Sequence, residues 1–138
     1  LNEIRAELMQ EGYIRRPKKG KAHKEKESAP MQFTTSDGFS VLVGRNNRQN
    51  DQLTLRRAQK NDMWFHTQKI PGSHVILQTE GRTPTETAIA EAAQLAAYYS
   101  RGKNSSQVPV DYTLVRHVSK PQGAKPGMVI YVNQKPAM

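Results

Sequence analysis

Four residues near the middle of the chain, Asp62, Trp64, His66 and His74, carry side chains that could do chemistry. Successive side chains of a strand point to opposite faces, so Asp62, Trp64 and His66 are predicted to share one face. Residues 74–78 are β-branched and apolar and predict a second strand, and the Ile-Pro-Gly-Ser run at 70–73 supplies turn chemistry between the two. A hairpin would therefore bring the two histidines together.

Metal binding and catalysis are the first chemistries to weigh. Imidazole and carboxylate groups bind zinc or iron, which makes Asp62, His66 and His74 candidate metal ligands. No HExxH or similarly spaced motif supports such a site, and no Walker or Rossmann glycine pattern is present, so we predict neither metal nor cofactor. Ser73 precedes His74, but neighbours on a strand face opposite ways and no nucleophile elbow surrounds them. The sequence favours a non-catalytic protein.

Nucleic-acid binding fits these residues better. An exposed Trp64 would offer a stacking platform, worth about 1–3 kcal/mol per base. The alternative is a buried Trp64 whose indole N–H meets a carboxylate such as Asp62, with the two histidines as hydrogen-bonded structural partners. Arg116 is a further candidate for a backbone contact. The residues that we predict to contact RNA are Arg45, Arg48, Arg56, Arg57, Asp62, Trp64, His66, His74, Arg101, Lys103, Lys120 and Lys125.

The charge balance points to a polyanionic partner. The chain has 138 residues, with 21 Lys and Arg against 12 Asp and Glu, a formal net charge of +9 and a pI of about 10. Such a protein binds nucleic acid by default, whereas the alternative is that the cations only aid solubility. The length suits one domain with a real core. Without cysteine there are no disulfides or thiolate metal sites, and no apolar run approaches the ~20 residues of a membrane helix.

The first thirty residues are expected to lie outside the folded domain. Residues 1–13 place Ile4 and Leu8 at helical spacing before Gly12, which predicts the end of a helix or coiled coil. Residues 14–30 predict a flexible basic linker, because 7 cations stand against one acid between positions 15 and 26. That linker could contact nucleic acid or serve only as a solvated tether. A start at Leu1, inside a helical pattern, predicts a fragment of a longer protein.

Residues 31–138 are predicted to form one α+β domain, with a mixed, mostly antiparallel sheet of about six strands and two main helices. Segments 31–35 and 39–43 flank an Asp-Gly turn, which is a hairpin signature. Asn46 or Asn47 is expected to cap a helix that runs to about Ala58. This domain is basic in its own right, with 13 basic and 7 acidic residues.

A second helix is predicted from Thr83 to about Ser100. Thr83, Pro84 and Glu86 form a capping box, and small alanines at helical spacing would let the helix lie close on the sheet. The loop at 101–106 is basic and rich in hydroxyl groups, so it could bind phosphates. Strands at 112–118 and 128–132, joined by a rigid basic loop at 120–127, complete the predicted sheet.

Several of these segments resemble the NFACT-R domain. The resemblance spans residues 31–138 and rests on segments 37–47, 50–51, 61–66, 71–75, 92–100 and 108–112. Its most specific part is the Asp-x-Trp-x-His run followed by Pro-Gly-Ser-His-Val. This domain closes the bacterial proteins called RqcH or fibronectin-binding protein A (FbpA), which are related to eukaryotic NEMF. The resemblance implies a C-terminal fragment of a bacterial, streptococcal-like member.

The resemblance further implies an RNA-binding module of a ribosome quality control factor. Such proteins bind large ribosomal subunits that carry a stalled peptidyl-tRNA, and they recruit alanyl-tRNA to extend the nascent chain. The expected partners are therefore tRNA and large-subunit rRNA, in a cytoplasmic, ribosome-associated setting. The alternative is a fibronectin-binding module, because streptococcal members are described as surface adhesins. Nothing in the sequence encodes export, so that role would need an unconventional route to the cell surface.

Overall fold

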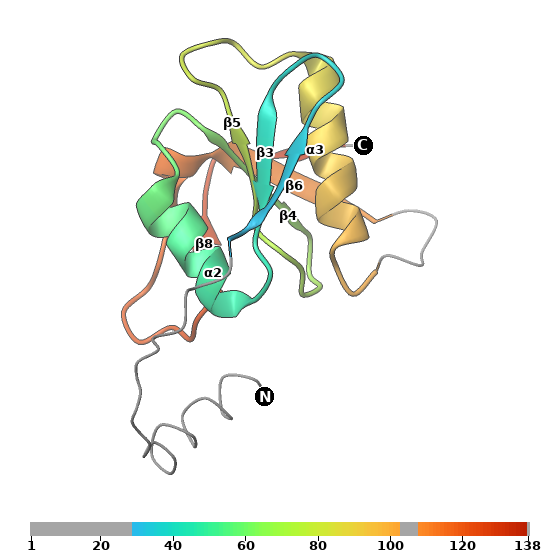
Figure 1. Ribbon diagram of the computed structural model, residues 1–138. Coiled ribbons are helices and arrows are strands. Elements are labelled where there is room, and N and C mark those ends of the chain that lie inside the picture. The colour runs from blue at the N-terminus through green and yellow to red at the C-terminus, as the bar shows by residue number, and fades with distance from the viewer. Residues whose placement is uncertain (1–28, 103–107, 138) are drawn as a thin grey trace, which may run out of the picture.

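A twisted antiparallel sheet forms the centre of the structure (Figure 1). The computed structural model describes residues 29–102 and 108–137. The sheet has six strands in the order β2-β3-β5-β4-β6-β9, and each neighbouring pair is antiparallel. The expected α+β class is confirmed. The strands are β2 (Met31–Thr34), β3 (Ser40–Val43), β4 (Met63–Thr67), β5 (Val75–Gln78), β6 (Val110–Leu114) and β9 (Lys135–Ala137).

The predicted hairpin at the start of the domain is confirmed. Strands β2 and β3 pair with Met31 opposite Val43 and Thr34 opposite Ser40. The turn places Gly38 at φ +97°, a conformation that glycine adopts without steric cost. Within the described residues, β2 forms one edge of the sheet.

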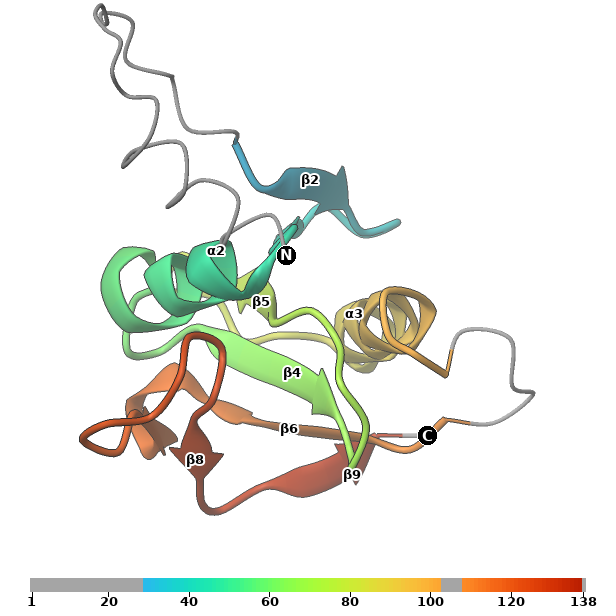
Figure 2. The ribbon, with the colours of Figure 1, turned by 90° about the horizontal axis from the view of Figure 1, so that it is seen from below.

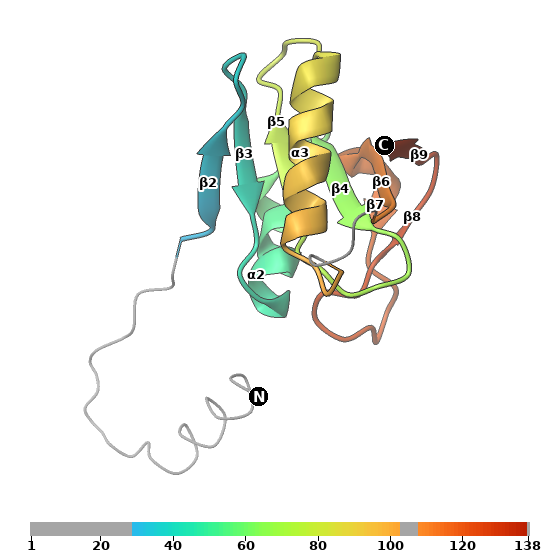
Figure 3. The same cartoon turned by 90° about the vertical axis from the view of Figure 1, so that its right-hand side faces the viewer.

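One face of the sheet is covered by the helix α3 (Glu86–Tyr98), as Figure 3 shows. Its buried residues are four alanines, and the absence of bulk there lets the helix lie close on the strands. The predicted start was wrong by two residues, because Thr85 and not Thr83 is the N-cap. Thr85 Oγ1 accepts a hydrogen bond from the Ala88 N–H at 3.0 Å and donates to the Asp37 carboxylate in the β2–β3 turn. This contact across the fold fixes where the helix begins.

The opposite face is covered by a helical segment and by a small second sheet (Figure 2). The helix α2 (Asn47–Asp51) starts at the expected cap, since Asn46 Oδ1 accepts from the Gln49 N–H at 2.8 Å. It then widens into a π-helix, η2 (Gln52–Arg57), which closes with the Ala58 N–H on the Leu53 carbonyl. The second sheet pairs β7 (Val118–Ser119) with β8 (Ile130–Tyr131).

The end of the domain differs from the prediction. The expected strand at 112–118 breaks after Leu114 into a 3-10 turn, η3 (Val115–His117). The Val115 N–H still donates to the Asp62 carbonyl at 2.9 Å, but the Asp62 N–H donates to the Gln59 carbonyl and not back to β6, so the pairing with β4 ends there. The expected strand at 128–132 shortens to β8 and leaves the main sheet. Its place as sixth strand is taken by β9, which pairs with β6 and was not predicted.

The sequence-based expectations for the tail at 1–13, for Lys103 and for most of the linker at 14–30 fall outside the described residues. The boundary proposed between linker and domain therefore stays a prediction.

Candidate nucleic-acid interface

Trp64, His66 and His74 form one aromatic cluster in the interior. Strands β4 and β5 pair as the predicted hairpin, and the two imidazole centroids lie 5.5 Å apart. The His66 ring stacks on Trp64 with an interplanar angle of 4°, and the His74 ring meets Trp64 edge-on. Tyr131 of β8 also packs against Trp64, with ring centroids 4.6 Å apart and an interplanar angle of 52°. The prediction that the histidines meet across a hairpin is confirmed.

Burial rules out Trp64 as a stacking platform in this structure. Its side chain is 1% exposed, so no base can lie on the indole. The alternative interpretation was a buried tryptophan bonded to Asp62, and it is correct on burial but wrong on the bond. Within the described residues the indole Nε1 has no hydrogen-bond partner. Asp62 instead accepts from the Gln59 N–H at 2.9 Å and the Thr79 N–H at 3.1 Å, which fixes the start of β4.

His74 connects three parts of the fold. Its Nε2 lies 3.2 Å from the Gly127 carbonyl, which can only accept, so Nε2 carries the proton. Its Nδ1 then accepts from the Thr54 hydroxyl of η2 at 2.7 Å. Burial, followed by the nearby imidazole of His66, lowers the pKa of His74 to about 4. The imidazole is therefore neutral at pH 7, and its two hydrogen bonds connect the sheet to η2 and to the loop before β8.

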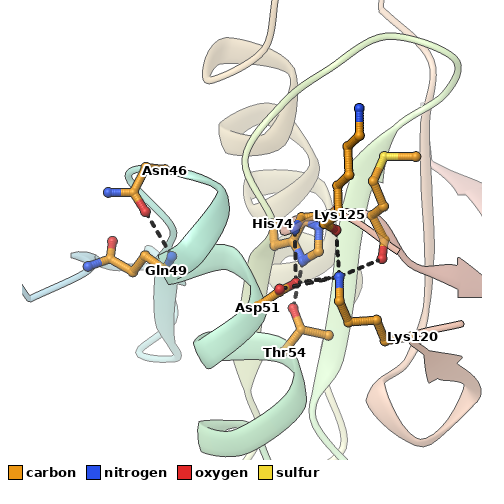
Figure 4. A network of polar contacts seen from close by, with 9 residues as sticks. Asn46, Gln49, Asp51, Thr54, His74, Lys120 and Lys125 are labelled. Atoms are coloured by element: carbon orange, nitrogen blue, oxygen red, sulfur yellow. Dashed lines mark hydrogen bonds and ion pairs between the residues drawn. The ribbon is translucent and has the colours of Figure 1, made fainter. Parts of the chain in front are cut away.

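A carboxylate and an ammonium group hold the same loop from the other side (Figure 4). Asp51 Oδ1 accepts from the Gly127 N–H at 3.0 Å, and Asp51 Oδ2 lies 3.3 Å from Lys120 Nζ. The same Nζ donates to the carbonyls of Lys125 at 2.6 Å and Met128 at 3.1 Å. An ammonium group has three N–H donors, and all three have acceptors here. The predicted role of Lys120 as a phosphate contact conflicts with this geometry.

These positions separate the candidate metal ligands. His66 and His74 are neighbours, but Asp62 lies at the far end of β4 and is occupied by two backbone N–H groups. In residues 29–102 and 108–137 no group of three or more His, Cys, Asp or Glu side chains could hold a metal ion. Burial also lowers the pKa of His66, whose Nδ1 lies 2.6 Å from the Thr67 carbonyl.

The arginines, in contrast, are exposed, and two of them meet at one cleft. Arg45 lies just before α2 and Arg101 just after α3, and the start of α2 and the end of α3 lie at the same end of the sheet (Figures 1 and 3). Arg48 is exposed in the first turn of α2, and Arg56 and Arg57 lie in the last turn of η2, further from the cleft. Lys125 is exposed on the loop before β8. The structure thus brings together Arg45 and Arg101 but not the whole predicted set.

The cleft has a volume of about 640 Å³. Three chain segments form most of it, namely residues 44–50 from the end of β3 into α2, the turn before β5, and the end of α3, and Met31 of β2 completes the lining. None of the described residues that line it is acidic. The lining residues are Met31, Gly44, Arg45, Asn46, Asn47, Asn50, Pro71, Gly72, Ser73, Tyr98, Tyr99, Ser100 and Arg101.

Backbone hydrogen bonds fix the three segments to one another. The Gly44 N–H donates to the His74 carbonyl at 3.1 Å, and the Ser73 N–H donates to the Tyr99 carbonyl at 2.9 Å. The Arg101 N–H donates to the Pro71 carbonyl at 3.0 Å. The cleft is therefore a preformed feature of the backbone.

Glycine is required at Gly44 by close contact. A Cβ there would lie 1.9 Å from Asn50 Oδ1, the atom that accepts from the His74 N–H at 3.1 Å. A methyl group at Gly72 would likewise press on the Ser100 Cβ at 2.9 Å. The cleft and the aromatic cluster thus share the backbone around His74.

The comparisons with known proteins agree with this architecture. The family described as "NFACT protein RNA binding domain" matches residues 30–133. The chain belongs to this NFACT-R family, which confirms the resemblance seen in the sequence.

Its relatives include proteins described as "Rqc2 homolog RqcH". The one from Bacillus subtilis is 50% identical over 97% of this chain, and the one from Streptococcus suis is 43% identical over 98%. The chain spans 24% of the length of each of these relatives. The C-terminal structure of the fibronectin/fibrinogen-binding protein from S. suis has a TM-score of 0.80 and 43% identity, over 98% of this chain and 53% of that one.

Sequence reasoning missed Tyr98 as the aromatic residue at the surface. Tyr98 is 55% exposed at the end of α3 and lines the cleft, whereas the sequence directed attention to the buried Trp64. A signal was present, because Tyr99 continues the apolar spacing of Ala88, Ala92 and Ala96 along the helix and Tyr98 does not. Among the described residues no helix is long and apolar enough to span a membrane, and the longest, α3, has 13 residues.

Proposed function

We propose that this domain is a non-catalytic RNA-binding module that contacts the phosphate backbone of tRNA or rRNA. The observation that carries the proposal is a set of exposed arginines without carboxylate partners around an acid-free cleft. Among the described residues, ion pairs engage only Arg82 and Lys120. The charges of Arg45, Arg48 and Arg101 are therefore available to a polyanion.

The longer protein that contains this domain is, in this proposal, a ribosome quality control factor. Its relatives are RqcH proteins, of which this chain covers about a quarter. The factor binds stalled large ribosomal subunits with peptidyl-tRNA in the cytoplasm and supports alanyl-tRNA recruitment. The domain contributes affinity for RNA there and carries no reaction of its own.

Among the predicted contact residues, the proposal keeps the exposed ones. Exposed cations at Arg56, Arg57 and Lys125 extend the basic surface beyond the cleft, and Lys103 follows Arg101 in the sequence. His74 acts indirectly, because its backbone accepts from the Gly44 N–H and donates to Asn50, both of which line the cleft. Trp64 and His66 pack against His74, and Asp62 holds the start of β4, away from the cleft.

Fibronectin binding is the second candidate, because the S. suis protein of similar structure is described as fibronectin/fibrinogen-binding. Within the described residues the six-stranded sheet ends in β2 and β9, and a peptide could add to β2 as a further strand, whereas Pro136 in β9 lacks the N–H that such pairing uses. The arginine-rich, acid-free cleft has no role in such binding, so the RNA interpretation is preferred.

A titration of the full 138-residue chain with mixed tRNA and with fibronectin, at low and physiological salt, tests the proposal. We expect tRNA binding that weakens steeply with salt, because each phosphate contact releases counterions. The double variant Arg45→Ala/Arg101→Ala should bind tRNA more weakly and with a shallower salt slope. The control Lys60→Ala/Lys135→Ala also removes two exposed charges, but outside the cleft.

Equal losses in the two double variants would show that only net charge matters, and the cleft arginines would lose their assigned role. Fibronectin binding that ignores both variants, with no tRNA binding, would favour the adhesin interpretation.

A further inference from the structure

We propose that the cleft between α2 and α3 binds a single unpaired nucleotide of RNA, with the base against Tyr98 and the phosphate between Arg45 and Arg101. This inference rests on the proposed RNA-binding function and specifies the part of the RNA that the cleft takes.

The aromatic wall comes from Tyr98. Of the large hydrophobic residues that are exposed in the described structure, Tyr98 is the aromatic one, at 55% exposure. Its ring meets Tyr99 edge-on with centroids 4.8 Å apart, and Tyr99 packs on Phe33 at 6.0 Å. The ring therefore has a partly buried aromatic support behind it. A supported, exposed ring is what base stacking requires.

The cations come from two different elements beside the cleft. The Arg45 Nε donates to the Ala29 carbonyl at 2.8 Å, which orients its guanidinium without neutralising it. The Arg101 N–H holds the backbone to Pro71, and within the described residues its guanidinium has no carboxylate partner. Since no acidic residue is among the described lining residues, a phosphate group entering the cleft meets attraction from both arginines.

The cleft is a wide, open depression of the surface and not an enclosed cavity, so a nucleotide bound there would stay partly in solvent. About 640 Å³ lies within the range of sites that hold small ligands, roughly 300–1,000 Å³. The side-chain amides of Asn46 and Asn47 line the same space, and the NH₂ group of Asn46, whose Oδ1 caps α2, is placed to donate to a ribose or a base edge. The Ser100 hydroxyl instead bonds to the Ala97 carbonyl and the Gly102 N–H.

The arrangement selects against paired RNA. In an A-form helix the bases stack on one another and their faces are covered, so a duplex can offer phosphates but no free base. Unpaired loops and ends offer both. The cleft should therefore contribute to binding of single-stranded RNA and leave duplex binding to the rest of the basic surface.

The experiment compares a ten-nucleotide single-stranded RNA with a blunt duplex of the same length, by fluorescence anisotropy with the full chain. Tyr98→Ala should weaken single-strand binding about tenfold and change duplex binding less than about twofold. Tyr98→Leu keeps apolar bulk for folding and should show the same loss. Tyr98→Trp keeps an aromatic ring and should bind the single strand as tightly as the wild type does. Leu55→Ala, which trims another exposed apolar side chain on η2, is the matched control and should change neither affinity.

A second readout follows the base itself. A 2-aminopurine placed in the single strand should lose fluorescence on binding the wild-type chain, and lose less on binding Tyr98→Leu. The proposal is overturned if Tyr98 variants bind single strands like the wild type, or lose duplex binding to the same extent. In both cases RNA binding itself would stand. A wild-type chain that binds neither RNA would overturn the proposed function together with this inference.

Discussion

The Nε2 of His74 lies 3.2 Å from the carbonyl oxygen of Gly127, 53 positions further along the chain. This hydrogen bond joins the strand hairpin that carries the family signature to the loop before β8. It accounts for the burial of a histidine there, since both ring nitrogens have protein partners.

Replacement of His74 by Ala should destabilise the domain by about 3 kcal/mol, because the Thr54 hydroxyl and the Gly127 carbonyl would lose their partners and a cavity would form. Urea unfolding followed by tryptophan fluorescence measures the change. Thr87→Ala, at an exposed position of α3, is the control and should stay within about 0.5 kcal/mol of the wild type. Similar unfolding curves for the two variants would contradict the role of His74 in connecting the sheet, η2 and the loop before β8.

Stability should fall as the solution is acidified from pH 6.5 toward pH 4. The pKa of His74 is about 4 in the folded protein and 6.5 in its ordinary state, so in this interval the unfolded chain binds a proton that the folded protein does not. The contribution of His74 to the free energy of unfolding is fully present above pH 6.5. It falls by about 3 kcal/mol as the pH drops to 4. His66 adds to the trend, since burial also lowers its pKa.

Unfolding midpoints of wild type and His74→Gln between pH 7.5 and pH 4.5 test this dependence. The variant should lose less stability across the interval than the wild type. Parallel losses in both proteins would assign the acid sensitivity to other groups.

Substitutions of Lys120 and Lys125 should have different effects, one on the stability of the domain and the other on its affinity for RNA. Lys120→Ala removes a donor from Asp51 and two carbonyls and should cost about 1–2 kcal/mol of unfolding free energy, with little specific effect on RNA binding. Lys125→Ala removes an exposed charge and should weaken RNA binding while the unfolding midpoint stays unchanged. Thermal melts and tRNA titrations of both variants measure the two quantities. The reverse pattern would restore Lys120 as a phosphate contact.

Gly44 and Gly81 should respond differently to a methyl group. At Gly44 a Cβ would lie 1.9 Å from Asn50 Oδ1, so Gly44→Ala must displace the side chain that holds the His74 N–H. At Gly81 the surroundings are open, and the cost of alanine comes from φ +82° alone, about 1 kcal/mol. We expect Gly44→Ala to lower the melting temperature more and to weaken RNA binding as well. A smaller effect at Gly44 than at Gly81 would mean that Asn50 relocates easily.

Local signals in the sequence predicted much of this fold. The Asp-Gly turn, the alternation around Trp64 and the cap at Asn46 are each decided by neighbouring residues, and the structure confirms them. The start of α3 is different, because Thr83 and Thr85 offer similar capping chemistry. The contact of Thr85 with Asp37, 48 positions away, decides between them.

The features that sequence reasoning missed depend on contacts between distant segments. Strand β9 contains Pro136, which argues against a strand in the sequence but is tolerated opposite Asp111 at the edge of the sheet. The burial of Trp64 depends on Tyr131, and Tyr131 is held in place by its hydroxyl on Asp111 at 2.9 Å. Neither contact leaves a pattern within a short window of sequence.

The loop before β8 also sets an order for folding during synthesis. Asp51 and the Gly127 N–H are 76 positions apart, so the contact between them forms only after most of the domain has left the ribosome. Until Tyr131 has been made, the indole of Trp64 lacks its cover and stays accessible to water and to chaperones. A chain whose synthesis stops before Tyr131 would therefore lack the side chain that packs 4.6 Å from the Trp64 ring, wherever in the preceding sequence the stop falls.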